Sequence, residues 1–302
     1  MKARTAWVQR FQSSRTGVAL HEKPLVVSTA ILFGLGVCAS ACGSGASQEE
    51  PAEEVPPADG DPGDSTGGGE DPADPVDASS FSFFVTSLES MRELSGSANG
   101  FGGDLRFGEA TGIEGADKIC RTIAEKALPG SGQKVWRAFL SASTGGANGG
   151  ALNAIDRIGE GPWYDRNGLR VASNKAGLLT ARPQGSTQIK NDLPNERGEP
   201  NHQGVDNHDT LTGSNKQGQY AGSKGNTCND WTSATGSTGK PAIGHSWPRS
   251  ANNPSNGGNW MSDHQAPGCA PGVNLSQNGP GSGSPTVGGG GYGGIYCFAI
   301  NP

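Results

Sequence analysis

The chain ends in the stretch "GGIYCFAINP" (293–302), and this stretch decides the fold. Cys297 lies there in a short apolar run, a few residues from the C-terminus. Chain ends fray unless something holds them. We therefore expect Cys297 to lie in a last buried strand and to be bonded to another part of the chain. The compartment in which the protein folds decides what kind of bond that is.

The N-terminus predicts export. Five basic residues precede the apolar stretch "PLVVSTAILFGLGVCASAC" (24–42), which is too short, and too rich in small residues at its end, for a spanning helix. Its last four residues resemble a bacterial lipobox, although Ala39 stands where that motif usually has Leu. The resemblance predicts a lipoprotein signal peptide over 1–41 and a lipid on Cys42. Lipidation of Cys38, or a secretory signal cut without lipidation, are the alternatives.

Residues 42–80 are predicted to be a disordered tether. They are rich in Pro, Gly, Asp and Glu and contain almost no large aliphatic side chains, so they cannot bury enough apolar surface to fold. Residues 1–80 hold 5 basic and 12 acidic residues, whereas 81–302 hold 18 and 17. The acidic excess thus belongs to the tether, and the nearly neutral remainder has no basic tract that would indicate nucleic-acid binding.

Residues 81–302 are long enough for one domain with its own core. Leu, Ile, Val and Phe are distributed unevenly: 23 lie in 81–180 and 11 in 181–302. The sequence therefore predicts a compact first half and a loop-rich second half. Such a domain needs cross-links, and four cysteines remain after the leader, at positions 120, 228, 269 and 297. No CxxC pair indicates zinc, so we expect two disulfides, for which three pairings are open.

Local patterns predict an α+β domain. A capping box at Thr111 and Glu114 opens a helix that Pro129 and Gly130 end, with Cys120 on its apolar face. The other predicted elements are strands over 81–87 and 134–143, a short helix over 151–159, and a hairpin over 161–173 that turns at Asn167-Gly168.

Four separated blocks carry a resemblance to a known family. They are "CRTIAEKALPGSGQKVWRAFLSAS" (120–143), "AIDRIGEGPWYDRNG" (154–168), "CNDWTS" (228–233) and "IYCFAI" (295–300). In this order they resemble the endostatin domain of basement-membrane collagens and exported bacterial lipoproteins similar to it. The resemblance implies a variant of the C-type lectin fold over 81–302. It also implies the pairs Cys120–Cys297 and Cys228–Cys269.

A C-type lectin-like fold raises the question of calcium-dependent sugar binding, which fold alone does not answer. Lectins of this fold hold calcium through a Glu-Pro-Asn loop and a Trp-Asn-Asp strand. Here Glu199-Pro200-Asn201 occurs, and Asn229 and Asp230 follow Cys228 in a changed order. We take Asn229 and Asp230 as candidate ligand-binding residues. The alternative is a turn in which their side chains bond nearby backbone N–H groups.

The loop "NHQGVDNHD" (201–209) supplies the candidate metal ligands His202, Asp206, His208 and Asp209. Imidazole and carboxylate groups this close in sequence could bind zinc or calcium. Their spacing fits no pair on one helix face, and a Gly-Asn-Asp loop carries such residues without an ion. We therefore predict no cofactor, with calcium or zinc at these four residues as the alternative.

Tryptophans are the other candidate binding residues. An indole exposed on a loop offers a flat apolar face to a sugar or a protein, which makes Trp163, Trp247 and Trp260 candidates. The alternative is that each ring fills a core poor in aliphatic side chains, which we favour for Trp231.

Enzymatic activity is not predicted. His245 and Ser246 are neighbours in sequence, which rarely face each other, and the chain has no Gly-x-Ser-x-Gly elbow. Asp156 and Glu160 flank Arg157 on a short helix, a pattern typical of a solvated face.

The functional prediction is a lipid-anchored cell-envelope module that recognises a glycan or an envelope or matrix protein through the 181–295 loops. A structural envelope lipoprotein without a specific ligand is the alternative.

Overall fold

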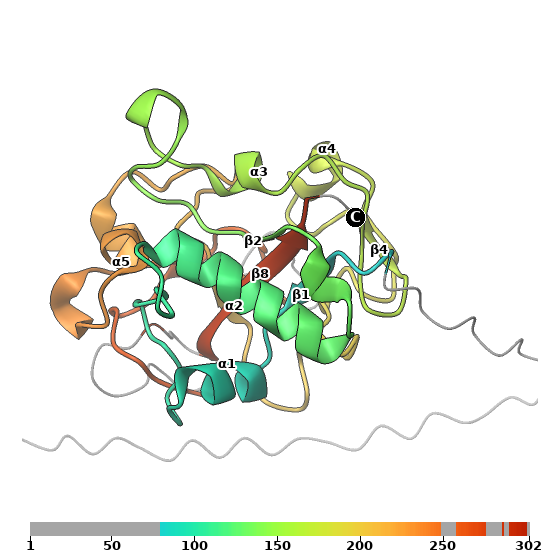
Figure 1. The fold of residues 1–302 in the computed structure, drawn as a ribbon, viewed down its shortest axis with the longest axis horizontal. Coiled ribbons are helices and arrows are strands. Elements are labelled where there is room, and N and C mark those ends of the chain that lie inside the picture. The colour runs from blue at the N-terminus through green and yellow to red at the C-terminus, as the bar shows by residue number, and fades with distance from the viewer. Residues whose placement is uncertain (1–78, 249–257, 276–285, 287–289, 301–302) are drawn as a thin grey trace, which may run out of the picture. The chain divides into compact units, whose positions relative to one another are not determined.

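The predicted last strand, β8 (Gly291–Ala299), is the centre of the fold (Figure 1). It pairs antiparallel with β1 (Phe83–Val85) and β2 (Trp136–Ala138) and parallel with β5 (Asp209–Leu211). The sheet continues from β5 through β6 (Ala242–His245) to β7 (His264–Gln265) at its edge. All nine residues of β8 are buried, as expected for a strand covered on both faces.

The computed structural model describes residues 79–248, 258–275, 286 and 290–300. All of them belong to one compact unit. The predicted signal peptide, Cys42, and the tether up to residue 78 lie outside the described residues.

The described part is an α+β domain with a mixed six-stranded sheet and few helices. Its α-helices are α1 (Leu88–Ser95), α2 (Gly112–Ala127), α3 (Ala154–Arg157), α4 (Lys175–Leu178) and α5 (Cys228–Trp231). Its 3-10 turns are η1 (Ser131–Gln133), η2 (Ala147–Gly149), η3 (Lys224–Thr227) and η4 (Gly236–Thr238), and β3 (Trp163–Tyr164) pairs with β4 (Arg170–Ala172) as a hairpin. As predicted, the longer helices precede residue 181, and the second half is mostly loop.

Helix α2 forms where the capping box predicts it. The Thr111 hydroxyl accepts from the Glu114 N–H, and the Glu114 carboxylate accepts from the Thr111 N–H. The helix buries Ile119, Cys120 and Ile123 on one face, toward the sheet. Cys120 forms a disulfide with Cys297 of β8, so the C-terminal strand is fastened to this helix.

Two disulfides cross-link the domain, and both pairs are the ones the family resemblance implies. Cys120 is bonded to Cys297 over a sequence separation of 177, and Cys228 to Cys269 over a separation of 41. The pairing prediction is confirmed. Disulfides persist in oxidising compartments, so the protein belongs to an extracytoplasmic environment.

Some predicted elements are shorter than expected. The strand over 134–143 is reduced to β2, and the helix over 151–159 to the four residues of α3. The predicted hairpin is present, and the Asp165 carboxylate accepts N–H bonds from Asn167 and Leu169 across its turn. Beyond β2 the backbone still forms single bonds, from the Phe139 N–H to the Tyr296 carbonyl and between Ala142 and Leu152, so the segment is a shorter strand followed by isolated pairing.

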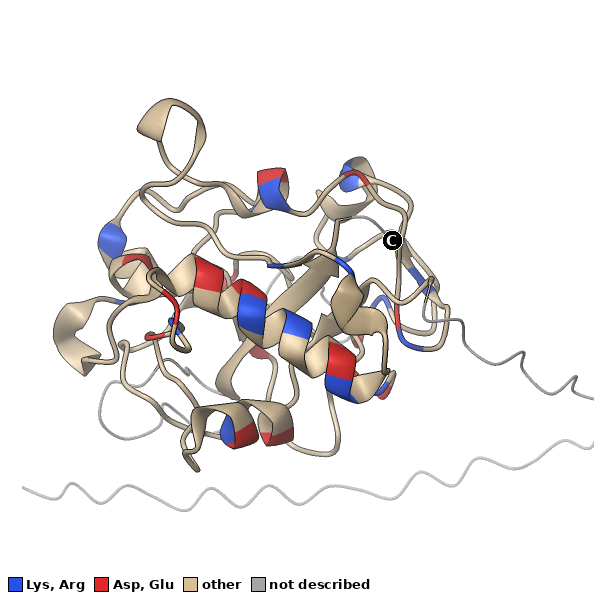
Figure 2. Cartoon of the chain, in the orientation of Figure 1, with Lys and Arg blue, Asp and Glu red and all other residues tan. Residues whose placement is uncertain are grey.

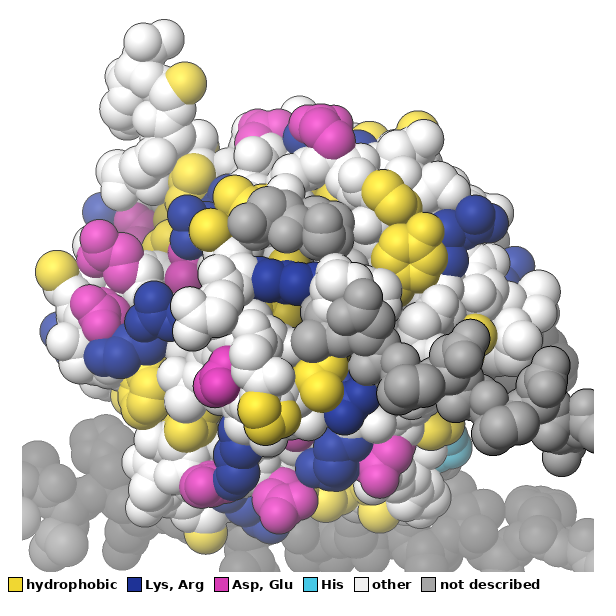
Figure 3. Space-filling model, turned by 45° about the vertical axis from the view of Figure 1, so that its right-hand side comes forward, with side chains coloured by type: hydrophobic (Ala, Val, Ile, Leu, Met, Phe, Trp, Pro, Cys, Tyr) yellow, Lys and Arg dark blue, Asp and Glu magenta, His cyan; other side chains and the backbone are white. Residues whose placement is uncertain are grey.

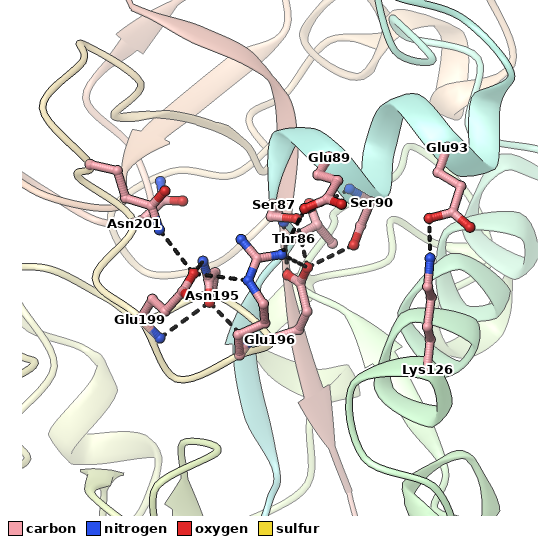
Figure 4. Close-up of polar contacts among 12 residues, drawn as sticks. Thr86, Ser87, Glu89, Ser90, Glu93, Lys126, Asn195, Glu196, Glu199 and Asn201 are labelled. Atoms are coloured by element: carbon pink, nitrogen blue, oxygen red, sulfur yellow. Dashed lines mark hydrogen bonds and ion pairs between the residues drawn. The ribbon is translucent and has the colours of Figure 1, made fainter.

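Helix α1 was not predicted, and a residue far along the chain supports its start (Figure 4). The buried Glu196 carboxylate accepts from the Ser87 N–H at 2.9 Å and from the hydroxyls of Ser87 and Ser90 at 2.6 Å each. A carboxylate at a helix N-terminus is favoured by the helix dipole. This contact joins the loop-rich half to the first half.

Charges are interspersed on the surface. Acidic and basic residues both occur along α2 (Figure 2), and the face in Figure 3 shows mixed charges with only a small area of histidine. This distribution agrees with the near-neutral charge of residues 81–302.

Candidate metal centre

Four potential metal ligands converge at one end of three neighbouring strands. Their donor atoms all lie within 4.8 Å of one another, and the residues are His208, Asp209, His245 and His264. Asp209 begins β5, and His245, its cross-strand partner, ends β6. His264, the first residue of β7, pairs with Ile243 of β6. Ile243 lies two positions before His245 in the same strand, so His264 and His245 are on the same face of the sheet. Strand pairing therefore assembles donors that lie up to 56 residues apart in the sequence.

One carboxylate oxygen is the hub of this cluster. The Oδ1 atom of Asp209 lies 3.2 Å from the Nε2 atom of His208, 3.5 Å from that of His245 and 3.2 Å from that of His264. Tetrahedral zinc has metal–ligand distances of about 2.0–2.1 Å, which places neighbouring ligand atoms about 3.4 Å apart. The three distances from Asp209 Oδ1 are close to three of the six edges of such a tetrahedron.

Three of the four donors are sealed from solvent. The side chains of His208, Asp209 and His245 are 1–2% exposed, whereas that of His264 is 37% exposed. Burying so many ionisable groups is costly unless each is paired or bound to a metal. The edge strand β7 therefore gives the cluster its one solvent-facing side.

Groups around the ligands orient the imidazoles. The Asp206 carboxylate contacts His208 Nδ1, and His264 Nδ1 lies 3.2 Å from the carbonyl oxygen of Gln265. Metal-bound histidines in proteins almost always donate the other ring N–H in this way. Both rings therefore direct Nε2 toward Asp209. Asp263 adds a further carboxylate, whose Oδ2 lies 3.5 Å from His245 Nε2.

Electrostatics within the cluster favour an ionised carboxylate. Burial raises the pKa of Asp209, but the hydrogen bond from His264 and the nearby imidazoles outweigh it and hold this pKa below its ordinary value. Burial lowers the pKa of His264, and the bond to Asp209 reverses the effect and raises it. Asp209 is thus available as an anionic ligand at neutral pH.

Two of the four predicted metal ligands of the 201–209 loop belong to this centre. His208 and Asp209 are donors, and Asp206 lies directly behind His208. His202 is not a donor: its exposed ring stacks on Trp247 with ring centroids 4.0 Å apart.

Sequence reasoning missed His245 and His264 as ligands, because they lie far along the chain. The scarcity of histidine is the one signal for them in the sequence. Of the five histidines in the chain, all except His21 lie in this cluster or on the Trp247 ring beside it.

The tryptophans are not exposed, so the premise of their predicted role is wrong. Trp163 and Trp260 are 0% exposed and Trp247 is 6% exposed. The Trp260 ring packs on Phe139 and donates to the Leu178 carbonyl, while Trp247 donates to Asn207. The loop-rich half has few aliphatic residues, and Trp247 and Trp260 fill part of its interior.

Asn229 and Asp230 are turn residues. Four consecutive residues, 228–231, have positive φ between 48° and 63°, a left-handed turn that L-residues rarely form. The Asp230 carboxylate accepts from the N–H and hydroxyl of Ser143, and the Asn229 amide donates to Thr232. The turn of the alternative is present, but Asp230 fastens it to Ser143, 87 residues away, and Asn229 bonds a side-chain hydroxyl where a nearby backbone N–H was expected.

No protein-family model matches this chain, and a search of curated proteins found no significant match. Among the described residues, none of the helices has the length and apolar character needed to cross a bilayer.

Proposed function

We propose that this protein is an exported zinc-binding domain, in which His208, Asp209, His245 and His264 hold one ion. The observation that carries the proposal is the position of Asp209 Oδ1, 3.2–3.5 Å from three imidazole Nε2 atoms. Three nitrogen donors and one oxygen donor suit zinc or a similar transition metal, whereas calcium takes six to eight oxygen ligands.

The ion has a structural role in this proposal. Four protein donors complete a tetrahedron and leave no open position for a substrate, which is the pattern of structural zinc sites. The ion joins β5, β6 and β7 at the edge of the sheet, in the half of the chain that has few aliphatic residues. The proposal therefore keeps the prediction that the protein is not an enzyme.

The test is metal analysis of the full chain, purified without chelators and supplied with zinc. We expect one zinc per chain. His264→Ala removes the most exposed ligand, with little change in packing, and should lose most of this zinc. His202→Ala is the matched control, because His202 is also exposed and near the cluster but is not a donor. Absence of zinc in the unaltered chain, or equal zinc in both variants, would contradict the proposal.

The finer placement of the protein is also a proposal. The four sequence blocks and the disulfide pairs support an endostatin-like variant of the C-type lectin fold. The lipobox-like end of the leader supports a lipid on Cys42 and attachment to the cell membrane or outer membrane. Detergent partitioning of the unaltered chain and of Cys42→Ala tests the anchor: the variant should be soluble or unprocessed, and lipid loss from Cys38→Ala instead would name the other cysteine.

A recognition role is the second candidate function, and a groove favours it. A cavity of about 390 Å³ lies between the start of α1 and the 195–207 loop. Its lining combines polar residues with apolar ones, among them Asn195, Arg197, Gln203, Val205 and Leu275. Pockets of this size with a few polar groups are typical ligand sites. The ligand class stays the predicted one, a glycan or an envelope or matrix protein.

A screen of immobilised glycans and envelope proteins with the full chain tests recognition. Binding that Gln203→Ala and Val205→Ser weaken would support the groove. If no probe binds, the structural alternative, a lipoprotein without a specific ligand, is favoured.

A further inference from the structure

Asp206 lies directly behind the proposed metal centre, and none of the donor atoms belongs to it. Its side chain is fully buried, and its Oδ1 atom contacts Nδ1 of His208. An ionised carboxylate can only accept a hydrogen bond, so the neutral imidazole that faces it carries its hydrogen on Nδ1. The lone pair of His208 is then on Nε2, the atom that lies 3.2 Å from Asp209 Oδ1.

The backbone holds Asp206 in this place. Gly290 packs so closely on it that a Cβ atom at 290 would lie 2.3 Å from Asp206 Oδ1. The carbonyl of Gly290 in turn accepts the N–H of Asp209 at 2.8 Å. Gly290 thus contacts both the ligand Asp209 and the Asp206 carboxylate that orients His208.

Charge gives Asp206 a second effect on the ion. Asp206 places a second carboxyl group behind the ligands, beside that of Asp209, in a buried site that a divalent cation suits. A carboxylate behind a ligating histidine also makes that imidazole a stronger ligand. His264, whose Nδ1 faces a neutral carbonyl, receives less of this effect.

We propose that Asp206 is a positioning residue, which fixes the ring of His208 with Nε2 toward the ion and thereby sets zinc affinity. This inference rests on the proposed zinc site. It adds to that site a residue that does not touch the metal and that distinguishes the surroundings of His208 from those of His264.

The test compares Asp206→Asn with the unaltered full chain in zinc competition against a chromophoric chelator. We expect zinc affinity to fall 10- to 100-fold, the usual effect of losing such a partner. The absorption spectrum of the cobalt-substituted protein should stay that of a tetrahedral site, because the four ligands are unchanged. Asp192→Asn is the matched control, since Asp192 accepts the His202 N–H and touches no donor. It should bind zinc as the unaltered chain does.

Equal zinc affinity of Asp206→Asn and the unaltered chain would overturn the inference and leave the zinc site intact. A changed cobalt spectrum would also overturn it, because Asp206 would then be a ligand. Failure of the unaltered chain to bind zinc would instead refute the proposed function.

Nitrogen NMR of the zinc-loaded unaltered chain gives a test that needs no variant. His208 should show a protonated Nδ1 and a metal-bound Nε2, and the reverse assignment would refute the role of Asp206 even if Asp206→Asn fails to fold.

Discussion

The two halves of the domain bury different chemistry. Among the described residues up to 180, 23 buried residues are hydrophobic and 7 are polar or charged; from 181 on, the numbers are 18 and 16. The first half is a conventional apolar core beside α2. The second half has an interior that is almost half polar, and such an interior is stable only when nearly every polar group is paired.

This difference shows how a loop-rich chain can still be compact. Buried Arg182 donates to four backbone carbonyls, of Lys190, His245, Ser246 and Gly258. Glu196 supports α1, and the histidine cluster occupies the end of β5, β6 and β7. Directional bonds and, by our proposal, an ion replace the missing aliphatic contacts. The predictions below separate the two halves.

The largest effect is expected from the disulfide that joins the halves. In the chain-entropy description, a loop of this length contributes roughly 5 kcal/mol, which the double variant Cys120→Ala/Cys297→Ala should lose. Urea unfolding should show the whole domain destabilised, because α2 and β8 both depend on the link.

The second double variant, Cys228→Ala/Cys269→Ala, should lose roughly 4 kcal/mol of stability. Hydrogen exchange should place that second loss mainly after residue 180, and equal loosening of α2 would contradict the comparison.

Zinc removal should weaken the second half next. Free zinc at 1,000 times its dissociation constant stabilises the folded state by about 4 kcal/mol, if unfolded chain does not bind it. Adding a chelator should therefore lower the melting temperature, and hydrogen exchange should rise first around β5, β6 and β7. Magnesium or calcium should not restore the loss. A melting temperature unchanged by the chelator would show that polar pairing alone supports this half.

Arg182→Met tests the polar interior without removing a proposed ligand side chain, although Arg182 bonds the backbone carbonyl of His245. Burial lowers the pKa of Arg182 to about 10, so the side chain is still charged at neutral pH. Its loss removes four hydrogen bonds to backbone carbonyls, of which only that of Ser246 is known to keep another donor, the Leu193 N–H. We expect a destabilisation of about 3 kcal/mol in chemical unfolding. Arg121→Met, on the exposed face of α2, is the control and should change stability by less than about 0.5 kcal/mol. Similar values for both would mean that the Arg182 bonds contribute little.

The smallest effect belongs to the first half. Thr111→Ala removes the cap of α2 and should destabilise the protein by about 1 kcal/mol. Because the Thr111 side chain bonds Glu114 within the first turn of α2 and belongs to none of β5, β6 and β7, zinc affinity should not change. Weaker zinc binding in Thr111→Ala would show that the halves are energetically coupled.

Local patterns predicted the first half well. The capping box at Thr111, the hairpin at Asn167-Gly168 and the buried face around Cys120 all depend on residues close in sequence. The extent of β2 and α3 was predicted less well: both are shorter than their sequence patterns, and the ends of an element are what local patterns define least. Helix α1 was missed although Ser87 at its N-cap and Gly96 at its C-cap are local signals, and Glu196, more than 100 residues away, adds support that no local pattern shows.

By itself, the sequence determined an α+β domain with a loop-rich second half, a buried C-terminal strand and, through the family resemblance, the two disulfide pairs. It also identified His208 and Asp209 as potential ligands. Only the tertiary structure joined them to His245 and His264, turned His202 away onto Trp247 and buried the tryptophans. The reason is physical: helix caps and turns are set by neighbours within a few residues, whereas a metal centre needs donors that strand pairing brings together from distant parts of the chain.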